Sequence, residues 1–240
     1  MSLELLRRAM EYTETVVCDL TSDDPRLPTP CDGWDAGRVL LHLADVADGL
    51  IALVETGDLA LPEPARTDDP DPVSIAGESL TRLAATLSTT SEKERAQAAA
   101  RAGAIEFTMH GWDIGVARDS GHLTPADLAN DVWTLASSLV SDEARGSNFA
   151  AAVDVPATAT PSDRLAGFLG RQTVRISAEA RTEADAGQDV RIPAAPGWSG
   201  GVWPPTRRNE SGEPITSGVR APTSTFTAPL PFPGFSRYGS

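Results

Sequence analysis

Two histidines and one glutamate have the side-chain types and the spacing needed to bind a metal ion. Glu106 and His110 lie four residues apart. A helix has about 3.6 residues per turn, so this spacing places both side chains on one helix face. His42 lies in a separate apolar stretch, residues 39–45. Two imidazoles and one carboxylate leave coordination positions open on a divalent cation, as in catalytic rather than closed structural metal sites.

Each of these features also has a simpler structural interpretation. Glu106 and His110 could form an ion pair on an exposed helix face, which is common at this spacing. His42, flanked by leucines, could be a core histidine that is hydrogen-bonded to a backbone carbonyl. Its place beside the apolar stripe of its helix favours a side chain that points into the protein interior.

Three charged residues near these positions are candidates for supporting roles. Asp113 lies three residues after His110, and Asp45 lies three residues after His42, so each carboxylate shares a helix face with one imidazole. Metal-bound histidines usually need such a partner to fix their orientation. Both aspartates could instead be solvated surface acids. Arg38, one turn before His42, is a candidate for binding an anionic group, although a surface arginine is the simpler interpretation.

Helical periodicity dominates the first 170 residues and predicts an all-α fold. Apolar residues recur at helical spacing within six stretches: residues 6–17, 39–54, 76–87, 92–118, 128–139 and 165–169. Asp35, Thr124 and Thr160 are the predicted N-caps of the second, fifth and sixth helices. Residues 55–73 hold four prolines and many acids, which predicts a long surface loop.

The predicted fourth helix contains Gly103, Gly111 and Gly115. Each glycine costs a helix roughly 1 kcal/mol relative to alanine. We therefore expect a neighbouring helix or a ligand to approach closely there.

Trp34 and Trp112 are expected to pack within the bundle rather than to contact a substrate.

The composition changes after about residue 180, where nine of the nineteen prolines lie. We predict a helical domain over residues 1–180 and an irregular, Pro/Gly-rich extension over residues 181–240, disordered or loosely docked. Residues 173–177 alternate like a short strand.

The formal net charge of -14 argues against nucleic acid or an anionic membrane surface as a partner. Cys18 and Cys31 are too few for a disulfide framework and suggest a reduced environment. The first residues lack an apolar signal core, and the most apolar stretch, residues 39–54, is too short and too polar to span a bilayer. These features predict a cytoplasmic protein.

Three stretches in order along the chain resemble one known family. They are similar to the signatures of the DinB-like, mycothiol-dependent maleylpyruvate isomerase N-terminal family of actinobacteria. The three stretches are residues 29–35 with 39–43, residues 106–113, and residues 163–171. The resemblance covers residues 1 to about 171. It implies a DinB-like four-helix bundle, here with extra short helices, that holds a divalent metal, usually zinc.

The resemblance also implies the ligands and the chemistry. The family's His-Glu-His ligands map onto His42, Glu106 and His110. The family's co-substrate is typically mycothiol, a low-molecular-weight thiol, which implies S-transfer to a small electrophilic substrate or its isomerisation. Related bundles often dimerise, so a homodimer is a further expectation. An open metal also suits a hydrolase that activates water, or a non-catalytic metal-binding protein.

Overall fold

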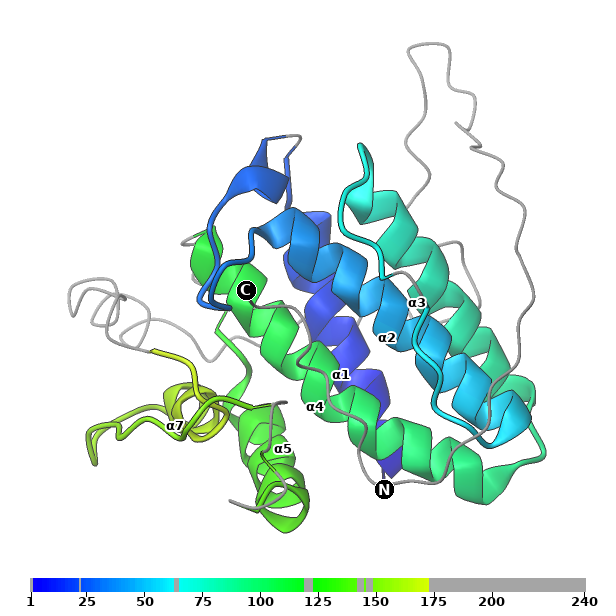
Figure 1. The fold of residues 1–240 in the computed structure, drawn as a ribbon. Coiled ribbons are helices and arrows are strands. Elements are labelled where there is room, and N and C mark those ends of the chain that lie inside the picture. The colour runs from blue at the N-terminus through cyan, green and yellow to red at the C-terminus, as the bar shows by residue number, and fades with distance from the viewer. Residues whose placement is uncertain are drawn as a thin grey trace.

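The computed structural model is a helical bundle, and it describes residues 2–21, 23–62, 65–118, 123–141, 145 and 149–172. Four long helices form its body (Figure 1). They are α1 (Ser2–Cys18), α2 (Ala36–Thr56), α3 (Pro72–Thr89) and α4 (Lys93–Ala117). A short helix, η1 (Asp24–Arg26), lies between α1 and α2, and α5 (Ala126–Leu139) and α7 (Pro161–Phe168) follow the bundle. The predicted all-α, DinB-like fold is confirmed, and the described residues contain no strand.

Helix α4 occupies the centre of the bundle. It packs against α1 and α2, and α3 packs on the other side of α2 (Figure 1). All thirteen residues from Gly103 to Gly115 are buried, so this part of α4 has no solvent-facing stripe. A polar side chain within it is costly unless it finds a partner inside the protein.

Two glycines of α4 allow α1 and α2 to approach closely, as their cost to the helix predicts. A Cβ atom on Gly103 would lie 2.9 Å from Leu6 of α1 and 2.9 Å from Leu50 of α2. A Cβ atom on Gly111 would lie 3.0 Å from both Tyr12 and Thr13 of α1. The close packing on these helices offsets the lost helix propensity.

Two of the three predicted N-caps are present. The Asp35 carboxylate accepts a hydrogen bond of 2.8 Å from the Arg38 amide at the start of α2. The Thr160 hydroxyl accepts one of 3.1 Å from the Asp163 amide at the start of α7. The predicted cap at Thr124 is wrong. Helix α5 begins at Ala126 with Pro125 before it, and the buried Thr124 side chain instead pairs with Tyr12.

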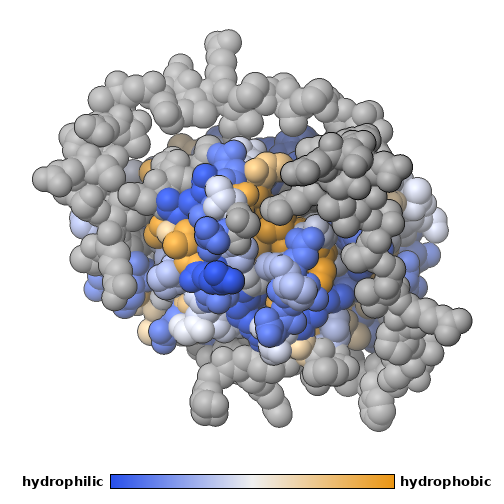
Figure 2. Space-filling model, turned by 90° about the horizontal axis from the view of Figure 1, so that it is seen from above, coloured by the Kyte–Doolittle hydropathy of each residue, from blue (hydrophilic) through white to orange (hydrophobic). Residues whose placement is uncertain are grey.

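Several predictions concern residues that lie outside the described part of the chain. The strand-like pattern at residues 173–177 and the irregular extension over residues 181–240 belong to this group. On the face shown in Figure 2, hydrophilic side chains dominate the described surface, and hydrophobic ones gather near the centre and toward the left. Within the described residues, no helix combines the length and the apolar character that crossing a bilayer would require.

Candidate metal centre

The three predicted ligands converge where α2 crosses α4. His42 comes from α2, and Glu106 and His110 come from successive turns of α4. One donor atom from each of the three residues lies within 4.8 Å of the other two. The Nε2 atoms of both histidines lie 3.5 Å from the same oxygen, Oε2 of Glu106. The side chains are only 12% (His42), 11% (Glu106) and 7% (His110) exposed.

The separations suit a shared cation better than direct hydrogen bonds. A nitrogen–oxygen hydrogen bond usually measures about 2.7–3.2 Å, which is shorter than the 3.5 Å observed here. A tetrahedral ion with ligand bonds of about 2.0–2.2 Å separates neighbouring donor atoms by roughly 3.3–3.6 Å. Two imidazoles and a carboxylate are also donors that transition-metal ions and zinc accept. The residues therefore fit a metal ion.

Asp113 and Arg171 lie behind His110. The Asp113 Oδ2 atom is 3.0 Å from His110 Nδ1, and the Asp113 side chain is fully buried. Arg171, which follows α7, donates from Nε to Asp113 Oδ1 at 3.2 Å and from Nη2 to Oδ2 at 2.9 Å. Asp113 therefore lies where a carboxylate that orients a metal-binding imidazole would lie.

The electrostatics of the cluster favour an ionised glutamate beside the histidines. Burial disfavours the charged carboxylate of Glu106, but the interactions with His110 and His42 hold its pKa well below the ordinary value. Burial lowers the pKa of His42. Burial also acts to lower the pKa of His110, but Asp113 and Glu106 together raise that pKa above the ordinary value. The negative charges of Asp113 and Glu106 therefore favour positive charge at His110.

Trp34 packs against the core, as expected, and it also covers the two imidazoles. Its ring meets His42 edge-on at a centroid distance of 5.0 Å and stacks on His110 at 6.2 Å. The Arg38 guanidinium lies 5.1 Å above the Trp34 ring. Arg38 is therefore next to the site, although its predicted role in anion binding is not tested. Trp112 is buried in the core, as expected.

Asp45 is buried, but its hydrogen bonds come from a loop arginine. Asp45 Oδ2 accepts from the Arg66 backbone amide at 2.9 Å, and Asp45 Oδ1 accepts from the Arg66 guanidinium. Arg38 in turn donates to the Arg66 carbonyl. Arg66 thus bridges Arg38 and Asp45, one on either side of His42 in the sequence of α2. The negative charge of Asp45 tends to raise the pKa of His42. The role of Asp45 in orienting His42 stays a prediction.

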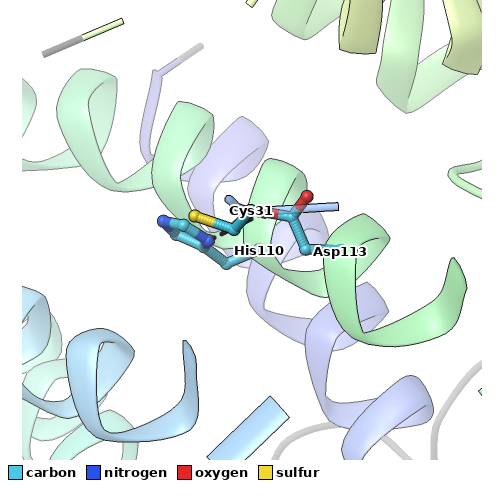
Figure 3. A group of neighbouring side chains, drawn as sticks. All are labelled: Cys31, His110 and Asp113. Atoms are coloured by element: carbon cyan, nitrogen blue, oxygen red, sulfur yellow. Dashed lines mark hydrogen bonds and ion pairs between the residues drawn. The ribbon is translucent and has the colours of Figure 1, made fainter. Parts of the chain in front are cut away.

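Cys31 is one residue of this region that no spacing in the sequence related to the ligands. It lies in the loop before α2, and its sulfur, a His110 nitrogen and an Asp113 oxygen all lie within 4.8 Å of one another. Figure 3 shows Cys31 over His110, beside Asp113. Burial raises the pKa of the Cys31 thiol to about 11, although the Arg171 charge acts in the opposite direction. The thiol is therefore protonated near neutral pH.

The sequence held only a weak signal for Cys31 and Arg171. Both fall within motifs of the family resemblance, but neither has a local spacing that relates it to a ligand. Arg171 is 58 residues from Asp113, and only the fold brings the two together.

Residues 6–115 match the model of the family described as the mycothiol maleylpyruvate isomerase N-terminal domain. The family resemblance is confirmed by this match. The matched stretch contains α2, most of α4 and all three candidate ligands. Arg171 lies beyond it. No curated protein and no solved structure matches the chain.

Proposed function

We propose that His42, Glu106 and His110 bind one divalent cation, and that zinc fits the site best. The observation that carries the proposal is the pair of 3.5 Å separations between the imidazole Nε2 atoms and Glu106 Oε2. A regular octahedral site with bonds of about 2.1 Å, as magnesium requires, would separate adjacent donors by only about 3.0 Å. Imidazole nitrogens also favour zinc over magnesium or calcium.

The protein is an enzyme that uses this site to activate a low-molecular-weight thiol such as mycothiol. A divalent cation with three protein ligands has an open position, and it lowers the pKa of a thiol or water that occupies it. Two observations support a thiol: the match to the mycothiol maleylpyruvate isomerase N-terminal domain, and the low exposure of the ligands, which limits competing water. The reaction is S-transfer to a small electrophile or its isomerisation. Such thiols are intracellular reagents, so the enzyme would act in the cytoplasm.

The chain's own residues have distinct tasks in this proposal. Glu106 supplies negative charge that offsets the charge of the cation in a buried setting. Asp113 accepts a hydrogen bond from His110 Nδ1–H, which would leave the Nε2 lone pair available to the cation. Trp34 covers the imidazole rings and narrows access of water to the ligands. Arg38 attracts an anionic group of a substrate, and its position over Trp34, next to the ligands, supports this role.

The test begins with metal analysis of the purified protein and continues with turnover of an electrophile. Maleylpyruvate should be assayed with mycothiol, with another thiol and with no thiol. We expect one bound cation per chain and turnover that depends on thiol. His110→Ala should abolish both, because two remaining ligands hold a divalent ion poorly. Asp113→Asn should reduce metal affinity or activity by about 10- to 100-fold.

The opposite outcomes are equally clear. Equal turnover without thiol would replace the transferase by a metal-dependent hydrolase. Bound metal without any turnover, across a panel of electrophiles, would indicate a metal-binding protein. A wild-type protein that binds no divalent cation would overturn the proposal entirely.

A further inference from the structure

Arg171 is held at a fixed position by the end of helix α7. Gly170 adopts the left-handed conformation, with φ of 86°. The Arg171 amide donates to the Ala166 carbonyl at 2.9 Å, and the Gly170 amide donates to the Gly167 carbonyl at 3.0 Å. These two bonds form a Schellman motif, which ends the helix and turns the chain. A Cβ atom on Gly170 would lie 2.7 Å from Ala150, so the turn also packs tightly.

The turn directs the Arg171 side chain at the carboxylate behind His110. The guanidinium contacts both oxygens of Asp113, from Nε at 3.2 Å and from Nη2 at 2.9 Å. Its third nitrogen, Nη1, donates to the Leu169 carbonyl at 3.3 Å. The Arg171 side chain is 14% exposed and the Asp113 side chain is fully buried. Two contacts from one planar group fix the carboxylate in rotation as well as in position.

We propose that Arg171 is a positioning residue of the metal site, acting on His110 through Asp113. This inference rests on the proposed metal binding by His42, Glu106 and His110. With Arg171 on one side of Asp113, the carboxylate faces His110 Nδ1 at 3.0 Å, and the opposite ring nitrogen faces Glu106. The segment after α7 thereby becomes part of a site whose ligands all lie before residue 111.

Removal of the guanidinium would leave a fully buried carboxylate with one partner fewer. Asp113 could then rotate away from His110 or take up a proton, and either change would loosen the imidazole. Lysine keeps the positive charge but lacks the planar pair of donors. The effect of Arg171→Lys should therefore lie between those of the wild type and Arg171→Gln.

The experiment is a double-mutant cycle with Co²⁺ as the probe, on the full-length chain. Affinity is measured by competition with a chromophoric chelator, and the cobalt absorption spectrum reports the ligand geometry. Arg171→Gln should weaken binding by about tenfold or more and alter the spectrum. In an Asp113→Asn background, the same change should weaken binding by less than about twofold, because the two residues act as one unit. Arg164→Gln, at an exposed position of α7, is the matched control and should bind like the wild type.

The outcomes separate this inference from the function it rests on. If the wild type does not bind Co²⁺, the proposed metal site itself fails. If the wild type binds and Arg171→Gln binds equally well, only the positioning role fails. Additive losses in the cycle would also overturn it, because Arg171 would then act by another route. If Arg171→Lys does not fold, as judged by circular dichroism, Arg171 is a structural residue and the inference is wrong.

Discussion

Replacement of Glu106 by glutamine should remove metal binding while it preserves the shape of the side chain. Glu106 is the only carboxylate among the three candidate ligands, and its Oε2 atom faces both imidazoles at 3.5 Å. Binding of structural zinc by four ligands is worth roughly 10–16 kcal/mol, or about 2.5–4 kcal/mol per ligand. About 1.4 kcal/mol corresponds to a factor of ten. The dissociation constant should therefore rise roughly 60- to 700-fold in Glu106→Gln.

The predicted loss appears directly in the unfolding free energy. At a metal concentration of about 100 times the dissociation constant, the wild type should gain about 2.7 kcal/mol of stability. At that same concentration the Glu106→Gln variant should gain no more than about 0.6 kcal/mol. Urea unfolding with added Zn²⁺ and with a chelator measures both gains.

The same substitution at an exposed position of the same helix provides the control. Glu94 lies in the first turn of α4 and is exposed. Glu94→Gln should retain the full metal-dependent stabilisation of the wild type. Wild-type stabilisation in Glu106→Gln would show that the carboxylate is not a ligand. An equal loss in Glu94→Gln would show that general charge, rather than the site, attracts the metal.

Three further predictions test the packing, the thiol and the proton balance. Gly111→Ala should lower the free energy of unfolding, measured in urea, by roughly 1–2 kcal/mol, because the added Cβ would lie 3.0 Å from Tyr12 and Thr13. A variant as stable as the wild type would contradict the close approach of α1. In a Cys18→Ala protein, alkylation of Cys31 at pH 7.5 should be roughly 100-fold slower than alkylation of a free cysteine, because the pKa of Cys31 is about 11. The rate should rise about tenfold per pH unit from pH 8 to 10. A rate that does not change with pH would refute the burial argument. Co²⁺ affinity should rise with pH below the raised pKa of His110, because the metal must displace a proton from that imidazole. An affinity that is independent of pH, or that falls as pH rises, would contradict this.

The helices could be predicted from the sequence because local signals determine most of their ends. The capping side chains of Asp35 and Thr160 act within three residues, so their partners can be read from the sequence. Thr124 shows the limit of such reasoning. Its hydroxyl has a competing partner, Tyr12, that is more than one hundred residues away in the chain. Tertiary contacts overrode the local signal there.

The candidate ligands were also predictable, but the residues around them were not. Glu106, His110 and Asp113 share one face of one helix, so their spacing alone relates them. Cys31 lies in a loop, and Arg171 follows a different helix; no periodicity connects either of them to His110. Local patterns can indicate which side chains share a face, but only the packed fold shows what lies opposite that face.

The placement of α4 explains why a charged cluster in this bundle points to binding. A helix buried all round contributes most to stability when it is apolar, because each buried charge must recover its lost hydration. This helix nevertheless carries Glu106, His110 and Asp113 within its buried part. Arg171 pairs with Asp113 from outside, and Asp113 pairs with His110, so the charges behind the site are balanced.

The atoms in front of the site are arranged differently. The two Nε2 atoms and Glu106 Oε2 converge at 3.5 Å, beyond ordinary hydrogen-bond length. A cluster selected only for stability would close these contacts or replace them with apolar side chains. Natural proteins accept such a local cost mainly at functional sites. A cation bound between the three ligands would account for this contrast between the close contacts behind His110 and the wider ones in front of it.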